Sequence, residues 1–237
     1  MRHVALVEEL ARVRPDLDDV EAVITGGRVL VDGVVITNPR SRVRAGSSIV
    51  VADPVDLRGS VKLRAALDRF GVDPAGTIAL DVGAAAGGFT RVLLERGAVR
   101  VYAVDAGHGQ LIGSLRQDVR VVNMERTNVG QLTPDRVSDP IGLVVVDVSY
   151  LSLSEAVRQI SGLRFGASAD LIGLVKPMFE LKLPSAPVDR PALVEALVAA
   201  VAGVEAAGWR VVGTMDSPVT GAGGAPELLL YARRLLL

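Results

Sequence analysis

Hydrophobic residues gather in short uninterrupted runs from about residue 77 to the end of the chain, and segments with helical periodicity separate these runs. Runs of this kind are typical of strands in a parallel sheet that helices cover on both faces. Strands are predicted at residues 77–81, 100–105, 119–123, 141–147 and 170–176, and helices near residues 89–96, 109–116, 152–162 and 189–207. Two last strands, 209–215 and 227–233, are predicted to pair antiparallel at the sheet edge. The alternation predicts an α/β, Rossmann-like fold with a mostly parallel, seven-stranded sheet.

The start of the chain follows a different pattern. Asp32-Gly33 separates two β-rich runs there and favours a tight hairpin. A short linker, residues 52–59, follows. We therefore expect a small α+β domain over residues 1–55 and the α/β domain over residues 56–237. Additional elements are predicted as helices at residues 3–13, 17–24 and 60–70, and a strand at residues 47–51.

Composition excludes several classes of protein. No uncharged apolar run reaches the ~18 residues of a membrane span, so no membrane association is expected. The first residues lack the apolar core and cleavage site of a signal peptide, which predicts a cytoplasmic protein. The chain has no cysteine, and its two histidines, His3 and His108, are far apart. We therefore predict no metal site.

The charged residues give a mixed indication. The net charge of −1 counts against a nucleic-acid partner. Among 26 basic residues there are three lysines, Lys62, Lys176 and Lys182. A lysine supplies a compact amine that can lose its proton, which arginine cannot, so these positions are candidates for proton chemistry. The alternative is that they reflect codon usage alone.

A loop of small residues follows the first strand of the α/β part. Residues 83–88 are all glycine or alanine, so a ligand can lie against their backbone; the alternative is close packing of helix against strand. Asp105 ends the next strand roughly 20 residues later, where a carboxylate can bind ribose hydroxyls. The loop matches neither the dinucleotide fingerprint nor the triphosphate loop. An adenosine ligand without phosphates is predicted, and S-adenosylmethionine is the common one.

Four polar side chains stand at the ends of predicted strands. They are Asp81, Asp105, Asp147 and Lys176. The carboxyl ends of parallel strands meet at one edge of the sheet, where ligands bind. A single aspartate at such a position is often only a helix cap, but four polar groups together favour a functional site.

A series of motifs along nearly the whole chain resembles one known family. The motifs lie at residues 58–63, 81–90, 104–111, 125–128, 146–153, 174–180 and 217–227. In this order they resemble the TlyA (haemolysin A) branch of the FtsJ-like 2′-O-methyltransferases. The resemblance implies an S-adenosylmethionine-dependent enzyme that methylates ribose 2′-hydroxyls of ribosomal RNA through a Lys-Asp-Lys-Glu tetrad. The matching positions here are Lys62, Asp147, Lys176 and Glu227.

The resemblance also implies a role for each residue of the site. Lys176 is expected to be the base, Asp147 to orient it beside the cofactor's methionine amine, and Glu227 to hold Lys62 or the substrate ribose. Residues 83–89 would contact the methionine part of the cofactor. The full set of expected cofactor contacts is Asp81, Gly83, Ala84, Ala85, Gly87, Gly88, Phe89, Asp105, Ala106, Glu125, Asn128 and Asp147.

The first 55 residues are similar to a small RNA-binding domain shared by a ribosomal small-subunit protein, pseudouridine synthases and tyrosyl-tRNA synthetase. Arg40, Arg42 and Arg44 are its remaining basic cluster, whereas its second helix begins with acidic residues. The resemblance implies ribosomal RNA or a ribosomal subunit as partner.

The chain departs from the family pattern at three places. Residues 181–188 form a shorter segment than is usual, Met178 replaces a glutamine, and Ala225 replaces an asparagine. Three hypotheses therefore stand: a ribosomal RNA 2′-O-methyltransferase, an S-adenosylmethionine-dependent enzyme acting on a small molecule of secondary metabolism, and a ribosome-binding protein without catalysis.

Overall fold

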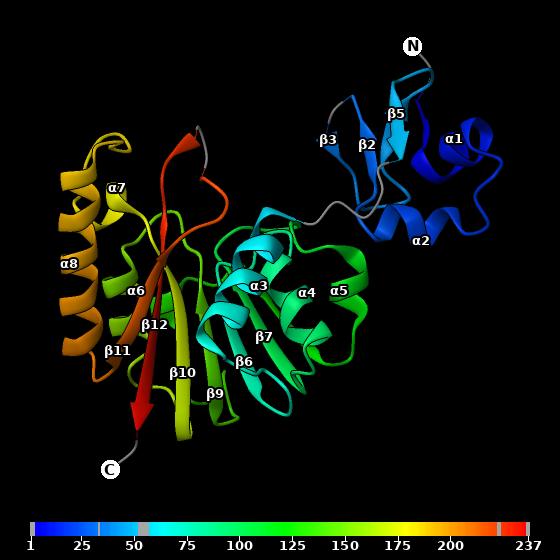
Figure 1. Ribbon diagram of the computed structural model, residues 1–237. Coiled ribbons are helices and arrows are strands. Elements are labelled where there is room, and N and C mark those ends of the chain that lie inside the picture. Colours follow the sequence, from blue (N-terminus) through cyan, green and yellow to red (C-terminus); the bar gives the residue numbers. More distant parts are fainter. Residues whose placement is uncertain (1–2, 33, 52–56, 222–223, 236–237) are drawn as a thin grey trace. The chain divides into compact units, whose positions relative to one another are not determined.

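The computed structural model describes residues 3–32, 34–51, 57–221 and 224–235. The chain forms two compact units, which are described separately. Residues 1–56 and 111–119 make up the first unit, and residues 57–110 and 120–237 make up the second (Figure 1).

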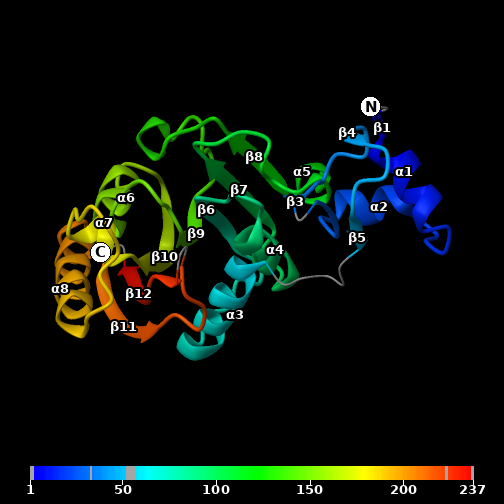
Figure 2. The same ribbon diagram turned by 90° about the horizontal axis from the view of Figure 1, so that it is seen from above.

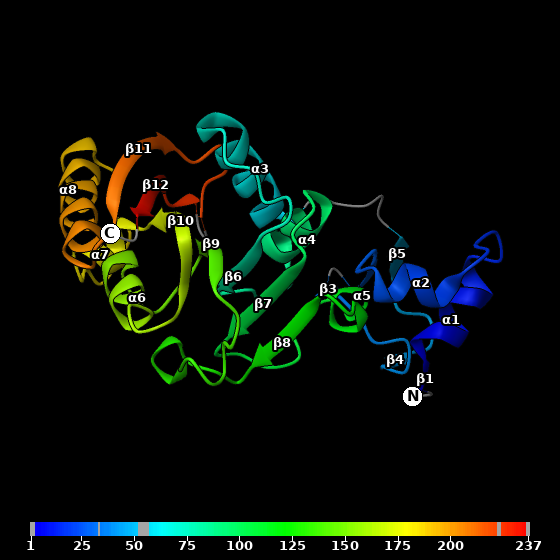
Figure 3. The same cartoon turned by 90° about the horizontal axis from the view of Figure 1, so that it is seen from below.

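The second unit is built on a seven-stranded sheet (Figures 1 and 3). Its strands are β6 (Ile78–Val82), β7 (Arg100–Asp105), β8 (Val121–Glu125), β9 (Ile141–Val146), β10 (Phe165–Val175), β11 (Arg210–Asp216) and β12 (Leu228–Leu235). Their order across the sheet is β11-β12-β10-β9-β6-β7-β8. The five strands from β10 to β8 are parallel, and β12 pairs antiparallel with β10 and β11. The mostly parallel seven-stranded sheet expected from the sequence is confirmed.

Helices cover both faces of this sheet (Figures 2 and 3). On one face lie α3 (Arg58–Phe70) and α4 (Gly88–Glu95), and on the other α6 (Leu153–Gln159) and α8 (Arg190–Ala206). The strands between them are apolar and buried, which is why their hydrophobic runs are continuous. Two short elements, the helix α7 (Pro177–Glu180) and the 3-10 turn η1 (Val129–Gln131), were not predicted.

The order of the strands indicates where in the sheet a ligand would bind. The chain enters the sheet at β6, continues outward to β7 and β8, and then returns to the other side of β6 with β9 and β10. At such a reversal the loops after the two central strands diverge and leave a crevice at their carboxyl ends. Here the two strands stay bonded up to that point, since Asp147 donates its backbone N–H to the carbonyl of Val82 over 2.9 Å.

The first unit is a small α+β structure. Its elements are β1 (His3–Ala5), α1 (Leu6–Val13), α2 (Val20–Thr25), β2 (Val29–Val31), β3 (Val34–Val35), β4 (Arg42–Arg44), β5 (Ile49–Val51) and α5 (Gly113–Gln117). The predicted hairpin is present as β2 and β3. The prediction of a helix from residue 3 was wrong, because residues 3–5 pair with β4, a strand that was also missed. Leu6, Leu10 and Ile24 are fully buried in the core of this unit.

No helix in the described part of the chain combines the length and apolar character needed to cross a bilayer.

Candidate active site

Asp81 lies at the end of β6 and is completely buried. The hydroxyl of Thr90, in α4, donates to its Oδ2 over 2.6 Å. Its Oδ1 has no hydrogen-bond partner among the described residues. Burial outweighs the bond from Thr90 and raises the pKa of Asp81 to about 7. The carboxyl group therefore needs either a proton or a further donor.

The glycines of the loop after β6 bring neighbouring segments close together. Gly83 has φ of 92°, and a Cβ there would lie 2.2 Å from the carbonyl oxygen of Asp147. A Cβ on Gly88 would lie 3.0 Å from the backbone nitrogen of Ser60, in α3. Both positions therefore have a packing reason to be glycine, which was the alternative to ligand binding.

Asp105 fixes the backbone of the same loop. It accepts hydrogen bonds from the N–H groups of Ala85, over 2.8 Å, and Gly107, over 2.6 Å. Ala85 has φ of 44°, a left-handed conformation that is costly for a residue with a Cβ. The carboxylate thus holds a strained loop in place and still has lone pairs for hydroxyl donors.

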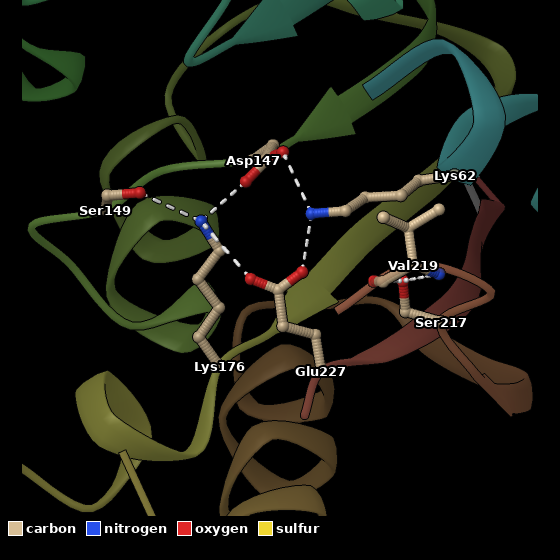
Figure 4. A network of polar contacts seen from close by, with 7 residues as sticks. All are labelled: Lys62, Asp147, Ser149, Lys176, Ser217, Val219 and Glu227. Atoms are coloured by element: carbon tan, nitrogen blue, oxygen red, sulfur yellow. Dashed lines mark hydrogen bonds and ion pairs between the residues drawn. The ribbon is translucent and has the colours of Figure 1, made fainter. Parts of the chain in front are cut away.

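The four tetrad positions meet at the carboxyl edge of the sheet (Figure 4). Lys62 Nζ lies 2.5 Å from Glu227 Oε2 and 3.9 Å from Asp147 Oδ2. Lys176 Nζ lies 2.6 Å from Asp147 Oδ1 and 4.0 Å from Glu227 Oε1. The two amines and the two carboxylates alternate around the network, so each cation lies near both anions.

The two halves of the network differ in burial. The side chains of Lys62 and Glu227 are 7% and 6% exposed, whereas those of Lys176 and Asp147 are 14% and 21% exposed. A substrate from solvent therefore reaches Lys176 and Asp147 first. Lys62 stands near the N-terminus of α3, where the helix dipole disfavours a cation, and the contact with Glu227 offsets this cost.

The other predicted cofactor residues have different surroundings. The ring of Phe89 is buried and packs against Gly59, so its side chain serves the contact between α3 and α4. Asn128 caps η1 together with Gln131. Glu125, at the end of β8, accepts the backbone N–H of Gln110 over 2.7 Å. Ala84 and Gly87 lie in the loop after β6, and Ala106 lies in the loop after β7.

Two polar residues near the tetrad received no role from the sequence. The hydroxyl of Ser149 accepts a hydrogen bond from Lys176 Nζ over 2.9 Å. Glu180, in α7, accepts from the backbone N–H of Leu153 over 2.5 Å and from the hydroxyl of Ser154 over 3.2 Å. Burial raises the pKa of Glu180. Glu180 thus ties the segment after Lys176 to the start of α6. Serine and glutamate are too common for either contact to be read from sequence.

A cavity of about 670 Å³ lies between α6, α7 and α8. It includes none of the four tetrad residues. Charge and strand-end position, rather than the volume of a hollow, therefore define the candidate site. In the described ranges no cluster of histidine, aspartate and glutamate could hold a metal ion.

The sheet order, the small-residue loop and the acidic ends of β6 and β7 define a Rossmann-like methyltransferase fold. A structure from Streptococcus thermophilus, described as a candidate hemolysin, matches 99% of this chain and 90% of its own, with 27% identity and a TM-score of 0.72. An S-adenosylmethionine-dependent methyltransferase from Mesorhizobium loti covers 72% of this chain and 96% of its own, with 16% identity and a TM-score of 0.52. The similarity to the Mesorhizobium loti structure supports the fold alone.

The model of the FtsJ-like methyltransferase family matches residues 56–234. The 16S/23S rRNA (cytidine-2′-O)-methyltransferase TlyA of Mycobacterium tuberculosis is 40% identical over 219 residues, which cover 89% of this chain and 81% of that protein. Hemolysin A of Brachyspira hyodysenteriae is 32% identical over 221 residues, 88% and 90% of the two chains. The chain belongs to the FtsJ-like methyltransferase family, as the sequence motifs indicated, and is an S-adenosylmethionine-dependent methyltransferase.

The residues present fit this cofactor. Asp81 Oδ1 is a buried acceptor to which no described residue donates, and a cofactor's methionine ammonium would supply a donor. Asp105 can accept from ribose hydroxyls in addition to its two backbone bonds. Residues 83–88, which follow β6, carry no side chain larger than a methyl group, so the cofactor can approach their backbone.

Proposed function

We propose that the protein methylates a ribose 2′-hydroxyl of ribosomal RNA. The observation that carries the proposal is the alternating network of Lys62, Asp147, Lys176 and Glu227 at the edge of a methyltransferase sheet. A ribose hydroxyl is a poor nucleophile, and its attack requires a base in hydrogen-bond reach. The relatives named as rRNA ribose methyltransferases support ribosomal RNA as the substrate class. A ribosomal substrate would place the enzyme in the cytoplasm.

The roles of the tetrad follow from the contacts. When bound, S-adenosylmethionine would supply an activated methyl group for transfer to the ribose oxygen. In its neutral amine form, Lys176 takes the proton that this oxygen loses, because Lys176 is the more exposed of the two lysines. Asp147 holds the amine of Lys176, and the Lys62–Glu227 pair fixes the other side of the network. The residues thereby align the hydroxyl for in-line attack.

The proposal is tested by transfer of a tritiated methyl group to ribosomal subunits from a strain that lacks the corresponding modification. Lys176→Met is expected to reduce transfer by at least 10²-fold, while calorimetry shows unchanged binding of the cofactor. Lys182→Met is the matched control, since Lys182 follows α7 and has no contact with the tetrad within the described chain, and it should transfer at the wild-type rate.

Cofactor binding without transfer to any ribosomal RNA would contradict the proposal. Methylated product in metabolite extracts would then favour the small-molecule enzyme. Full activity of Lys176→Met would contradict the role of Lys176 and leave the substrate class in place.

A further inference from the structure

Lys176 has a contact outside the tetrad. Its Nζ donates to the hydroxyl of Ser149 over 2.9 Å, and Figure 4 shows Ser149 on the side of the amine away from Lys62. Ser149 is exposed and lies between β9 and α6, two residues after Asp147. One short segment therefore supplies two of the groups that surround the amine.

Lys176 has as many nearby acceptor groups as a neutral lysine amine has N–H groups. A neutral lysine amine has two N–H groups and one lone pair, and only the lone pair can take a proton. Asp147 Oδ1 at 2.6 Å and Ser149 Oγ at 2.9 Å are both within hydrogen-bond distance. Glu227 Oε1 at 4.0 Å is beyond it. With both N–H groups engaged, the lone pair points in the remaining direction.

One acceptor alone would not achieve this. The four-carbon stem of lysine is flexible, and its amine rotates about the last bond. The ion pair with Asp147 alone holds the amine on one side and leaves the lone pair free to rotate. The hydrogen bond to Ser149 removes this freedom, and orientation of this kind contributes directly to the rate.

The chemistry of the second acceptor also matters. A carboxylate at position 149 would stabilise the ammonium form, because an adjacent anion favours a cation. A hydroxyl accepts the N–H without adding charge. The charged groups that face Lys176 are Asp147, Glu227 and, across them, Lys62, so the tetrad is neutral when all four are ionised.

We propose that Ser149 is a positioning residue, which accepts one N–H of Lys176 and so directs the lone pair of this base toward the substrate hydroxyl. The inference rests on the proposed function, since it assigns Lys176 as the base. It concerns orientation rather than contact with the cofactor.

The test compares Ser149→Ala, Ser149→Thr and the control Ser161→Ala. Ser161 is exposed at the end of α6, away from the carboxyl edge. Ser149→Ala is expected to lower kcat by about 10- to 100-fold with unchanged KM and unchanged binding of the cofactor. Ser149→Thr keeps the hydroxyl and should retain most of the rate.

A second measurement does not need activity. The chain has three lysines, so in a sample labelled with ¹³C-lysine the Cε signals can be assigned by substitution. Relaxation of the Lys176 Cε group should show greater mobility in Ser149→Ala than in wild type or Ser149→Thr. Equal mobility, or equal kcat of Ser149→Ala and wild type, would overturn the proposal. Absence of RNA methylation by wild type, with mobility changed as expected, would instead contradict the proposed function alone.

Discussion

The carboxyl group of Asp81 is ionisable and has no exposed surface. Its pKa of about 7 lies above the ordinary value of 3.8, so the folded state binds the proton more tightly than the unfolded state does. The stabilisation is present below pH ~4 and is lost as the pH rises to about 7. This rise in the pKa of Asp81 corresponds to a fall of about 4 kcal/mol in the free energy of unfolding over that pH range.

Asp81→Asn is therefore expected to remove the fall in the free energy of unfolding between pH 4 and pH 7. Urea unfolding of both proteins at several pH values measures this. A wild-type protein whose stability does not fall over that interval would contradict the assignment.

Gly83, in the loop after β6, packs directly against the backbone of Asp147. Gly83→Ala is expected to destabilise the protein and lower kcat/KM by about 10²-fold, because the new Cβ would displace the backbone of Asp147. Gly71→Ala is the control: Gly71 also has positive φ, of 66°, but a Cβ there would meet no atom within 4 Å. Chemical unfolding and steady-state kinetics measure the stability and the activity of the two variants. Equal loss of activity in both variants would refute a steric cause.

The sequence indicated the charged residues of the site better than the neutral ones. Asp147 and Lys176 were found because each interrupts or ends an apolar run, and a charge at the end of a buried strand has few explanations. Ser149 and Thr90 were missed because their roles depend on where another side chain ends, which no local pattern encodes. Phe89 stays a predicted cofactor contact, and its ring is buried close to Gly59.

At the scale of elements, the Lys62–Glu227 pair links α3 to the residue before β12. Both side chains are buried, so removing one leaves an uncompensated charge. Lys62→Met and Glu227→Leu are each expected to cost about 3–5 kcal/mol of stability. The double variant should cost less than the sum of the two single variants.

The exposed pair Arg64–Glu95, between α3 and α4, is the control for that measurement. Its charges are 2.7 Å apart, but the side chains are 29% and 47% exposed. Glu95→Gln, at the more exposed end of this pair, should cost less than about 1 kcal/mol. Additive losses for the Lys62 and Glu227 variants in urea unfolding would show that the two groups are not coupled.

Long elements were predictable and short ones were not. α8 and β7 agree with the sequence prediction to within about a residue, because long periodic or apolar segments carry a strong signal. β4 has three residues and α7 has four, which is too short for any period to be visible. β10 begins at Phe165, earlier than predicted, because its first residues, Gly166 to Ala169, are small or polar and resemble a loop.

At the scale of the whole molecule, the net charge of −1 gives no sign of an RNA partner, so RNA binding requires a local surface. We propose the first unit as that surface. Arg42 and Arg44 lie on the exposed face of β4, and Arg40 is exposed nearby. Alternation along the strand puts Val43 in the core and the two arginines outside.

Arg40→Gln and Arg42→Gln are each expected to weaken binding to ribosomal subunits and to reduce the slope of log K against log salt by about 1. Arg69→Gln, exposed in the last turn of α3, is the control and should leave the slope unchanged. Binding titrations at several salt concentrations measure the slope. Unchanged slopes for the variants in the first unit would contradict RNA binding at β4.

Under the proposed function, the network around Lys176 directs methyl transfer to a ribose oxygen. Nucleoside mass spectrometry of ribosomal RNA after reaction with deuterium-labelled cofactor tests it most directly, because fragmentation separates ribose from base. Ribose methylation through Lys176 predicts the label on the ribose with wild type and its loss with Lys176→Met. Label on a base, or unchanged ribose label with Lys176→Met, would contradict it.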